Sequence, residues 1–126
     1  MVTVLHNNVC DADITVVNGA LGVDTATIQL EAATGDLAII GCIPFYFSNN
    51  SDGSSLSVTS TDVTSLAIGT DGLIVPISEN VSGFLVSESD GDIDLAIEIP
   101  SGKTVYLVLV MPDGRLVISG AITYAE

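Results

Sequence analysis

The sequence predicts an all-β protein, an antiparallel β-sandwich or a small β-barrel of about eight to ten short strands. Short apolar segments recur at close spacing, and turn-forming Gly, Pro, Asn and Asp residues separate them. The C-terminal third has the pattern of three successive strands, a C-terminal meander. Helix-like periodicity never exceeds one turn. We therefore expect one β domain over residues 1–126.

The clearest strand pattern lies at the start of this meander, in residues 92–99. Isoleucine and leucine alternate there with acidic residues, as expected for a strand with one buried face. Pro100-Ser101-Gly102 follows as a turn. Residues 103–111 are apolar on both faces, which is typical of a central or doubly covered strand.

The end of the meander is predicted to be a hairpin. Pro112-Asp113-Gly114 has turn chemistry, because Pro presets φ and Gly accepts a positive φ. Residues 115–119 then return as the partner strand. The two cations, Lys103 and Arg115, would lie near opposite ends of this hairpin, too far apart to form one site.

In the first half of the chain, strands are predicted at 2–5, 13–17, 26–31 and 37–47. The first of these is a short strand or part of an extended arm formed by residues 1–8. Asn18-Gly19 predicts a tight turn. Pro44 predicts an edge position or a bulge, because proline has no backbone N–H for the ladder.

The middle of the chain is less regular. Residues 48–55 are uniformly polar and predict a long exposed hairpin loop. Residues 61–68 are ambiguous, since Thr61 or Asp62 could cap one helical turn. Further strands are predicted at 56–58, 73–77, 83–86 and 121–124.

The composition is more apolar than an isolated domain of this size requires. Hydrophobic residues make up 48% of the chain before glycine is counted, whereas average usage reaches about 45–50% only with glycine included. We expect some of this surplus to be buried against other copies or another protein, so a homo-oligomer is predicted.

The charge balance restricts the possible partners. Sixteen acidic residues oppose two basic ones, giving a net charge of −14. Binding to nucleic acid or to anionic membranes requires clustered Lys and Arg, so both are excluded. Such a surface suits a protein that meets high salt or faces outward from a larger assembly.

No signal peptide or transmembrane segment is predicted. The N-terminus lacks a basic region before its short apolar run. The longest apolar stretch, 37–47, contains Pro44 and is shorter than the ~20 residues that a span needs. Without an export signal, Cys10 and Cys42 are expected to be buried thiols rather than a disulfide.

The best candidate for a metal site is a weak Ca²⁺ candidate formed by Asp90, Asp92 and Asp94. These carboxylates would share one face of a strand, and hard cations prefer oxygen ligands. The calcium-loop pattern fails, because Leu95 occupies its glycine position. A solvated acidic face that discourages edge pairing is the favoured interpretation, so no cofactor is predicted.

The remaining motifs do not indicate catalysis. Gly102-Lys103-Thr104 resembles the end of a phosphate-binding loop, but Ile97 replaces the required first glycine and a strand follows. His6 is the only histidine and is expected at the surface. Neither cysteine belongs to a Cys-x-x-Cys pair, and no nucleophile elbow occurs. We therefore expect no enzyme activity.

The chain resembles the small capsid decoration (cement) proteins of tailed bacteriophages. The resemblance is one of type: size, acidity, and strands rich in Val, Ile, Thr, Ser and Gly. The ends, such as Val2-Thr3-Val4 and Ile122-Thr123-Tyr124, could serve as arms. The resemblance implies a virion protein that sits outside the shell, contacts the major capsid protein and bridges neighbouring subunits.

Two alternatives remain open at the level of the sequence. One is a different virion component, such as a head fibre base, a tail tube or a baseplate module. The other is a host or cell-surface binding module that presents its loop at Asn49–Ser55.

Overall fold

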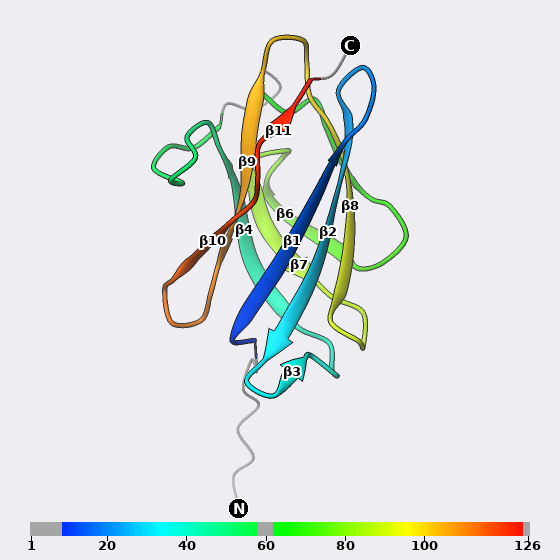
Figure 1. The fold of residues 1–126 in the computed structure, drawn as a ribbon, viewed down its shortest axis with the longest axis vertical. Helices are drawn as coiled ribbons and strands as arrows, with labels where there is room; N and C mark the ends of the chain where they lie inside the picture. Colours follow the sequence, from blue (N-terminus) through cyan, green and yellow to red (C-terminus); the bar gives the residue numbers. More distant parts are fainter. Residues whose placement is uncertain (1–8, 58–61, 125–126) are drawn as a thin grey trace, which may run out of the picture.

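The chain folds into two antiparallel sheets that pack face to face (Figure 1). The computed structural model describes residues 9–57 and 62–124. Within these residues it is all-β, with no helix and no closed barrel. The predicted antiparallel β-sandwich is therefore confirmed.

Sheet 1 has five strands, four of them in the order β1-β2-β8-β5 with β3 paired to β2. In Figure 1, β1, β2 and β8 cross in front of the other sheet. The strands of sheet 1 are β1 (Asp11–Asn18), β2 (Val23–Ala32), β3 (Gly35–Asp36), β5 (Ser65–Ile68) and β8 (Asp92–Glu98).

Sheet 2 has six strands, five of them in the order β10-β9-β4-β7-β6 with β11 paired to β9. Every described pairing in both sheets is antiparallel. The strands of sheet 2 are β4 (Cys42–Ser48), β6 (Leu73–Ser78), β7 (Ser82–Val86), β9 (Thr104–Val110), β10 (Leu116–Ile118) and β11 (Ile122–Thr123).

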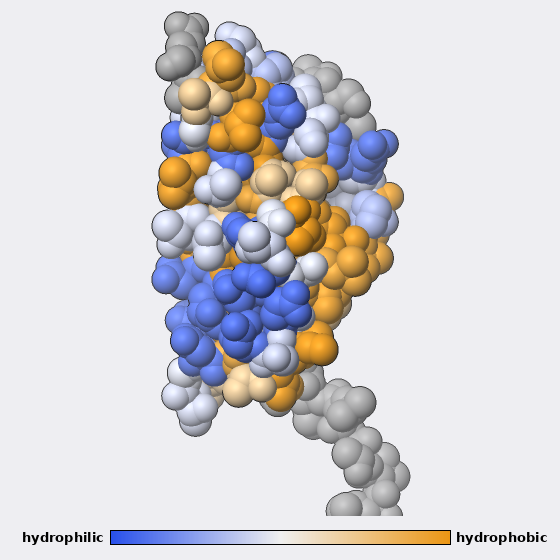
Figure 2. All heavy atoms as spheres, turned by 90° about the vertical axis from the view of Figure 1, so that its right-hand side faces the viewer, coloured by the Kyte–Doolittle hydropathy of each residue, from blue (hydrophilic) through white to orange (hydrophobic). Residues whose placement is uncertain are grey.

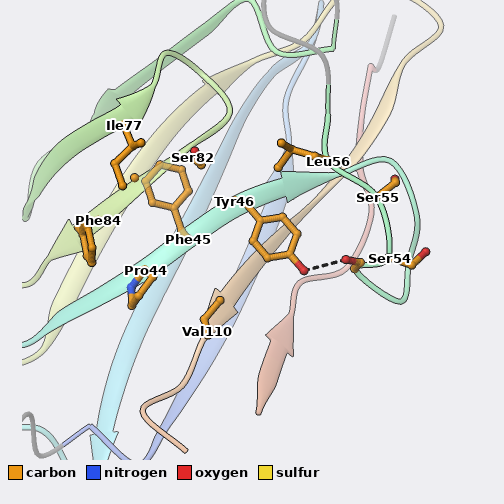
Figure 3. Close-up of a pocket in the computed structure, with 12 residues that line it drawn as sticks. Pro44, Phe45, Tyr46, Ser54, Ser55, Leu56, Ile77, Ser82, Phe84 and Val110 are labelled. Carbon is orange, nitrogen blue, oxygen red and sulfur yellow. Dashed lines mark hydrogen bonds between the residues drawn. The ribbon is translucent and has the colours of Figure 1, made fainter. Parts of the chain in front are cut away.

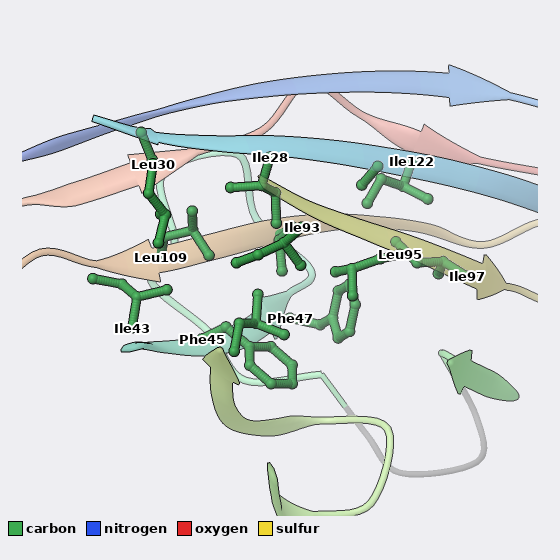
Figure 4. Packing of buried hydrophobic residues seen from close by; sticks show 14 of the residues in the cluster. Ile28, Leu30, Ile43, Phe45, Phe47, Ile93, Leu95, Ile97, Leu109 and Ile122 are labelled. Atoms are coloured by element: carbon green, nitrogen blue, oxygen red, sulfur yellow. The ribbon is translucent and has the colours of Figure 1, made fainter. Parts of the chain in front are cut away.

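The core fills the space between the inward faces of the two sheets (Figure 4). Successive side chains of a strand point to opposite sides, so every second residue of the central strands is buried. The rings of Phe45 and Phe47 meet edge to face with centroids 5.9 Å apart. The largest fully buried side chains of β2, β8, β4 and β9 are Ile28, Leu30, Ile93, Leu95, Ile97, Ile43, Phe47, Leu107 and Leu109.

The predicted C-terminal meander is wrong, because its strands divide between the two sheets and β8 pairs with β2 and β5 rather than with β9. β8 belongs to sheet 1 and β9 to sheet 2, so the turn at Pro100–Gly102 carries the chain from one sheet to the other. The hairpin of β9 and β10 forms as predicted, with Leu116 opposite Val110 and Gly114 at a φ of 88°. β11 confirms the last predicted strand and pairs with the other end of β9. Alternation predicted the buried face of β8 correctly, but it carries no information about the partner strand.

The predicted strand 37–47 begins too early. Residues 37–41 lie in no strand, and β4 begins only at Cys42. Gly41 is tightly packed in this connection, since an added Cβ would lie 2.7 Å from Leu37 Cδ2 and 3.1 Å from Val9 Cγ2. The edge position predicted from Pro44 is also wrong, because β4 lies between β9 and β7. The missing N–H is tolerated there because the described ladder with β9 begins only at Phe45.

The ambiguous segment 61–68 contains a strand and no helical turn in its described part. Its strand, β5, pairs with β8, and the backbone N–H of Thr64 donates to Glu98 O over 2.8 Å. Leu66 and Ile68 pack against the core from this edge. Three predictions fall wholly or partly on residues outside the described ranges: the strand or arm at 1–8, the end of strand 56–58 and the cap at Thr61. Leu56 and Ser57 are not in a strand.

The polar loop at 49–57 folds over the outer face of sheet 2. The hydroxyl of Tyr46 donates to Gly53 O over 2.7 Å, and the N–H of Ser57 donates to Phe47 O over 2.9 Å. Val108 points outward from β9, yet it is fully buried. The loop is exposed at Asn49–Asp52, as predicted. It does not close a hairpin, however, because the next strand, β5, belongs to the other sheet.

The two cations, Lys103 and Arg115, form ion pairs in different parts of the sandwich. Lys103 Nζ lies 3.4 Å from the buried Asp62 Oδ1. Arg115 Nη1 lies 3.4 Å from the exposed Asp11 Oδ1, and its Nη2 donates to Cys10 O. The two side chains thus contact different partners, which agrees with their predicted separation.

Replacing Val108 with alanine is expected to lower the free energy of unfolding by about 1.5–3 kcal/mol, because the side chain is fully buried and two methyl groups are lost from it. The same change at Val75, an exposed outward position of sheet 2, is the matched control and should cost less than about 1 kcal/mol. Urea denaturation followed by circular dichroism measures both. Equal losses would contradict the burial of Val108 on the outer face of sheet 2.

Replacing Lys103 with methionine is expected to lower the free energy of unfolding by about 1–3 kcal/mol, because the buried carboxylate of Asp62 loses its counter-charge. Arg115→Met breaks an ion pair between exposed side chains and should cost less than about 1 kcal/mol. Thermal and urea unfolding of the two variants give the comparison. A larger loss for Arg115→Met would contradict this ranking.

Candidate functional site

Charged residues are divided unequally between the two sheets. The strands of sheet 1 hold half of the 16 acidic residues in the chain, namely Asp11, Asp13, Asp24, Glu31, Asp36, Asp92, Asp94 and Glu98. The six strands of sheet 2 contain no Asp, Glu, Lys, Arg or His. The molecule therefore has one strongly acidic sheet and one uncharged sheet.

The outer face of sheet 2 is apolar as well as uncharged. The face not covered by the loop, which we call the apolar face, consists of Pro44, Leu56, Leu73, Val75, Ile77 and Phe84. Val75 is 45% exposed, Ile77 70% and Phe84 36%. Figure 2 shows hydrophobic residues gathered along the right-hand side and hydrophilic residues in the lower left part. Large apolar side chains exposed together mark a surface suited to contact with another protein.

A groove of about 420 Å³ runs through the apolar face (Figure 3). The loop forms one wall through Leu56, and Ile77 and Phe84 form the other. The side chains of Tyr46 and Val110 lie between them. The Tyr46–Gly53 hydrogen bond holds the loop wall in place. No charged side chain lines this groove, so it can accept an apolar group.

The predicted acidic cluster lies on the other sheet. Asp92 and Asp94 occupy successive outward positions of β8, and Asp90 precedes them in a turn where its Oδ1 accepts from Asp92 N. Thr70 Oγ1 donates to Asp94 Oδ2 over 2.9 Å. Burial raises the pKa of Asp92, and the neighbouring carboxylates of Asp71, Asp90 and Asp94 raise it further.

The side chains of this cluster are not arranged as metal ligands. Among residues 9–57 and 62–124, no three His, Cys, Asp or Glu side chains could hold a metal ion together. The polar face of sheet 1 therefore gives a dense negative field without a defined cation site in the described structure.

The other residues considered in the sequence are scattered. Cys10 and Cys42 are exposed thiols rather than the buried thiols that were expected. Gly102 lies in the turn between the sheets, with Lys103 directed to Asp62. His6 lies outside the described residues.

Sequence reasoning missed the apolar face itself. Its signal was present in the outward positions of 73–77, 83–86 and 103–111, which are apolar where a solvated strand would be polar. At 103–111 that pattern was interpreted as a central or doubly covered strand, and β6 shows that an edge strand can carry it too. Only the sheet order reveals that these positions share one outer face.

Asp24 is the one acidic residue of β2 that points inward, and it is fully buried. Its Oδ1 accepts a hydrogen bond from Gly19 N over 2.8 Å, whereas its Oδ2 has no hydrogen-bond partner in the described structure. Burial raises the pKa of Asp24, and the hydrogen bond from Gly19 acts in the opposite direction. The chain around it, Gly19–Gly22, forms a wider turn than the predicted Asn18-Gly19 hairpin, with Leu21 and Gly22 both at positive φ.

Comparison with known proteins gives no relative: no family model, no curated protein and no solved structure matches the chain. The part of the chain that the structure describes holds no helix long and apolar enough to cross a membrane.

Replacing Asp24 with asparagine is expected to stabilise the protein at neutral pH and to leave it nearly unchanged at low pH. The folded protein holds the Asp24 proton more tightly than the unfolded chain does. The stability that comes from this tighter proton binding by Asp24 is therefore complete below the ordinary pKa of 3.8. It is lost as the pH rises through the raised pKa of the folded protein. Urea denaturation of the wild type and of Asp24→Asn, from below pH 3.8 to neutral pH, measures the difference in their free energies of unfolding. A difference that did not grow with pH would contradict the assignment.

Proposed function

We propose that this chain is a non-enzymatic structural protein of a virion. It decorates the outside of a capsid and stabilises the shell by bridging neighbouring subunits. The division of the surface into an acidic sheet and an uncharged apolar sheet supports this proposal. One side of the molecule is suited to water and the other to burial against protein.

The apolar face provides the free energy for assembly. Ile77 and Phe84 stand exposed beside the groove. Removing apolar surface from water contributes about 25 cal/mol per Å². Aromatic side chains at the centre of a contact commonly carry much of the binding energy, so Phe84 is the expected anchor.

The acidic sheet provides solubility on the opposite side. Its outer face carries Asp11, Asp13, Asp92 and Asp94. Like charges on neighbouring copies repel, which spaces decorated particles apart and opposes their aggregation. An outward-facing protein also has no need to neutralise packaged nucleic acid, which agrees with the net charge of −14.

The stabilising mechanism is mass action. A protein that binds the assembled shell and not its separate subunits stabilises the shell by its binding free energy. This mechanism requires no catalytic group. A bridging contact with two subunits also resists their separation more strongly than two independent contacts would.

Particles that lack this protein are expected to lose integrity at a lower temperature and a lower chelator concentration than complete particles. Adding the purified chain back should restore resistance, because binding selects the assembled shell. Ile77→Asp should restore it poorly. Ile40→Asp, which alters an equally exposed residue outside the apolar face, is the matched control and should restore it fully.

Light scattering and electron microscopy of heated particles measure this effect. If particles without the protein resist heat and chelator as well as complete ones, the decorating role is wrong.

A further inference from the structure

We propose that Asn18 is a site of spontaneous modification, where the side-chain amide converts to a carboxylate and β11 is thereby released from β1. A glycine follows this residue directly, and Asn18-Gly19 is the only Asn-Gly pair in the chain. In such a pair the backbone nitrogen of the glycine can attack the amide carbon of the asparagine, because glycine has no Cβ to obstruct the approach. The hydrogen bonds of Asn18 and Gly19 and the position of Asp24 support the inference.

The side chain of Asn18 joins the two sheets. Its Nδ2 donates to Ala121 O over 3.4 Å, and its Oδ1 accepts from Thr123 N over 3.0 Å. β1 belongs to sheet 1, whereas β11 pairs with β9 of sheet 2 (Figure 1). We call these two hydrogen bonds the clasp, because they connect the end of β1 to β11 across the edge of the sandwich.

The fold also holds the attacking nitrogen. Gly19 N donates to Asp24 Oδ1 over 2.8 Å. An added Cβ at Gly19 would clash with Val23 O, so the turn requires glycine at the position that makes the asparagine reactive. Ring closure turns the amide of Asn18 toward Gly19 N and away from β11. The clasp must therefore open before the reaction proceeds.

The reaction needs water as its only co-reactant. Gly19 N forms a bond to Asn18 Cγ, the bond from Cγ to Nδ2 breaks, and the Gly19 proton leaves with Nδ2 as ammonia. The product is a succinimide ring. Water opens the ring by adding its hydroxyl to either carbonyl carbon while its proton returns to the ring nitrogen. Aspartate results, or isoaspartate, in which the main chain runs through Cγ.

The clasp is the part of this edge that can open while the core stays folded. Both of its hydrogen bonds are exposed to solvent. Ile122 is fully buried and holds β11 against β9. Exposed hydrogen bonds at the end of a short strand open at a lower free energy than the buried core does.

The product cannot form the same clasp. A carboxylate at position 18 has no N–H to donate, so an acceptor oxygen would face Ala121 O. Asn18 also lies directly opposite the buried Asp24 in the pairing of β1 with β2. Like charges at opposed positions destabilise a strand pair. Because the ammonia is lost, the original clasp does not form again.

Peptide mapping by mass spectrometry, during incubation of the purified chain at neutral pH, measures the conversion of Asn18. Thr123→Pro should convert several-fold faster than the wild type, because it lacks the N–H that holds Asn18 Oδ1. Thr123→Val keeps this N–H and is the matched control, so its rate should equal that of the wild type. Asp24→Ala frees Gly19 N and should also convert faster, which provides a second test if Thr123→Pro does not fold.

Circular dichroism confirms that each variant is folded before the incubation. The same peptide maps contain Asn49, Asn50 and Asn80, which no glycine follows, and these should convert more slowly than Asn18 in Thr123→Pro. Equal rates at Asn18 in the wild type and in the folded clasp variants would overturn the inference. Faster conversion at the other asparagines would overturn it too.

Asn18→Asp reproduces the modified chain and tests the release of β11. Its melting temperature should fall by about 4 °C or more, and hydrogen exchange at the amide of Thr123 should become several-fold faster. Asn50→Asp, which alters an exposed asparagine of the loop, is the matched control and should change neither quantity. An Asn18→Asp chain with the melting temperature and the Thr123 exchange rate of the wild type would contradict the release.

Discussion

The packing of two inward apolar faces is the constraint on which the rest of the molecule depends. Every central strand must give alternate residues to the core, and Ile28, Ile93, Phe47 and Leu107 meet there from four different strands. This leaves the outward positions as the places where the two sheets can differ. Sheet 1 fills many of them with Asp, Glu, Thr and Gln, although Val17 and Val23 are also exposed there, whereas sheet 2 fills most of them with apolar and aromatic side chains and none with a charged one. The two-sided surface follows from a single core that both sheets share.

Strand alternation allowed much of the fold to be predicted from the sequence. The buried isoleucines of β8 and the hairpin at Gly114 follow from local pattern and turn chemistry, which act over a few residues. The partner of each strand does not follow from them. β8 and β9 are neighbours in sequence but lie in different sheets, and β5, Ser65–Ile68, is a strand because it pairs with β8. These features depend on contacts between residues far apart in the chain, which periodicity does not encode.

The site was harder to predict than the fold for the same reason. The acidic positions Asp90, Asp92 and Asp94 are adjacent in sequence and were noticed at once, yet they form no metal site in the described structure. Val75, Phe84 and Pro44 come from three different strands, and only the order β4-β7-β6 places them side by side. The surplus of apolar residues in the composition indicated that such a face should exist, and the sheet order shows where it lies. The shared core leaves this face on the outside, and its lack of charge suits contact with another protein. The proposed role is the burial of the face in that contact.

Hydroxyl-radical footprinting tests most directly whether the apolar face is an interface in the native assembly. The rates of modification of Ile77 and Phe84 are compared between the assembled protein and the same protein released at high dilution. Burial of the face predicts that both side chains react several-fold more slowly in the assembly, while the exposed Ile40, which lies outside the face, keeps its rate. Equal reactivity of Ile77 and Phe84 in the two states would contradict the assignment of this face as the contact surface.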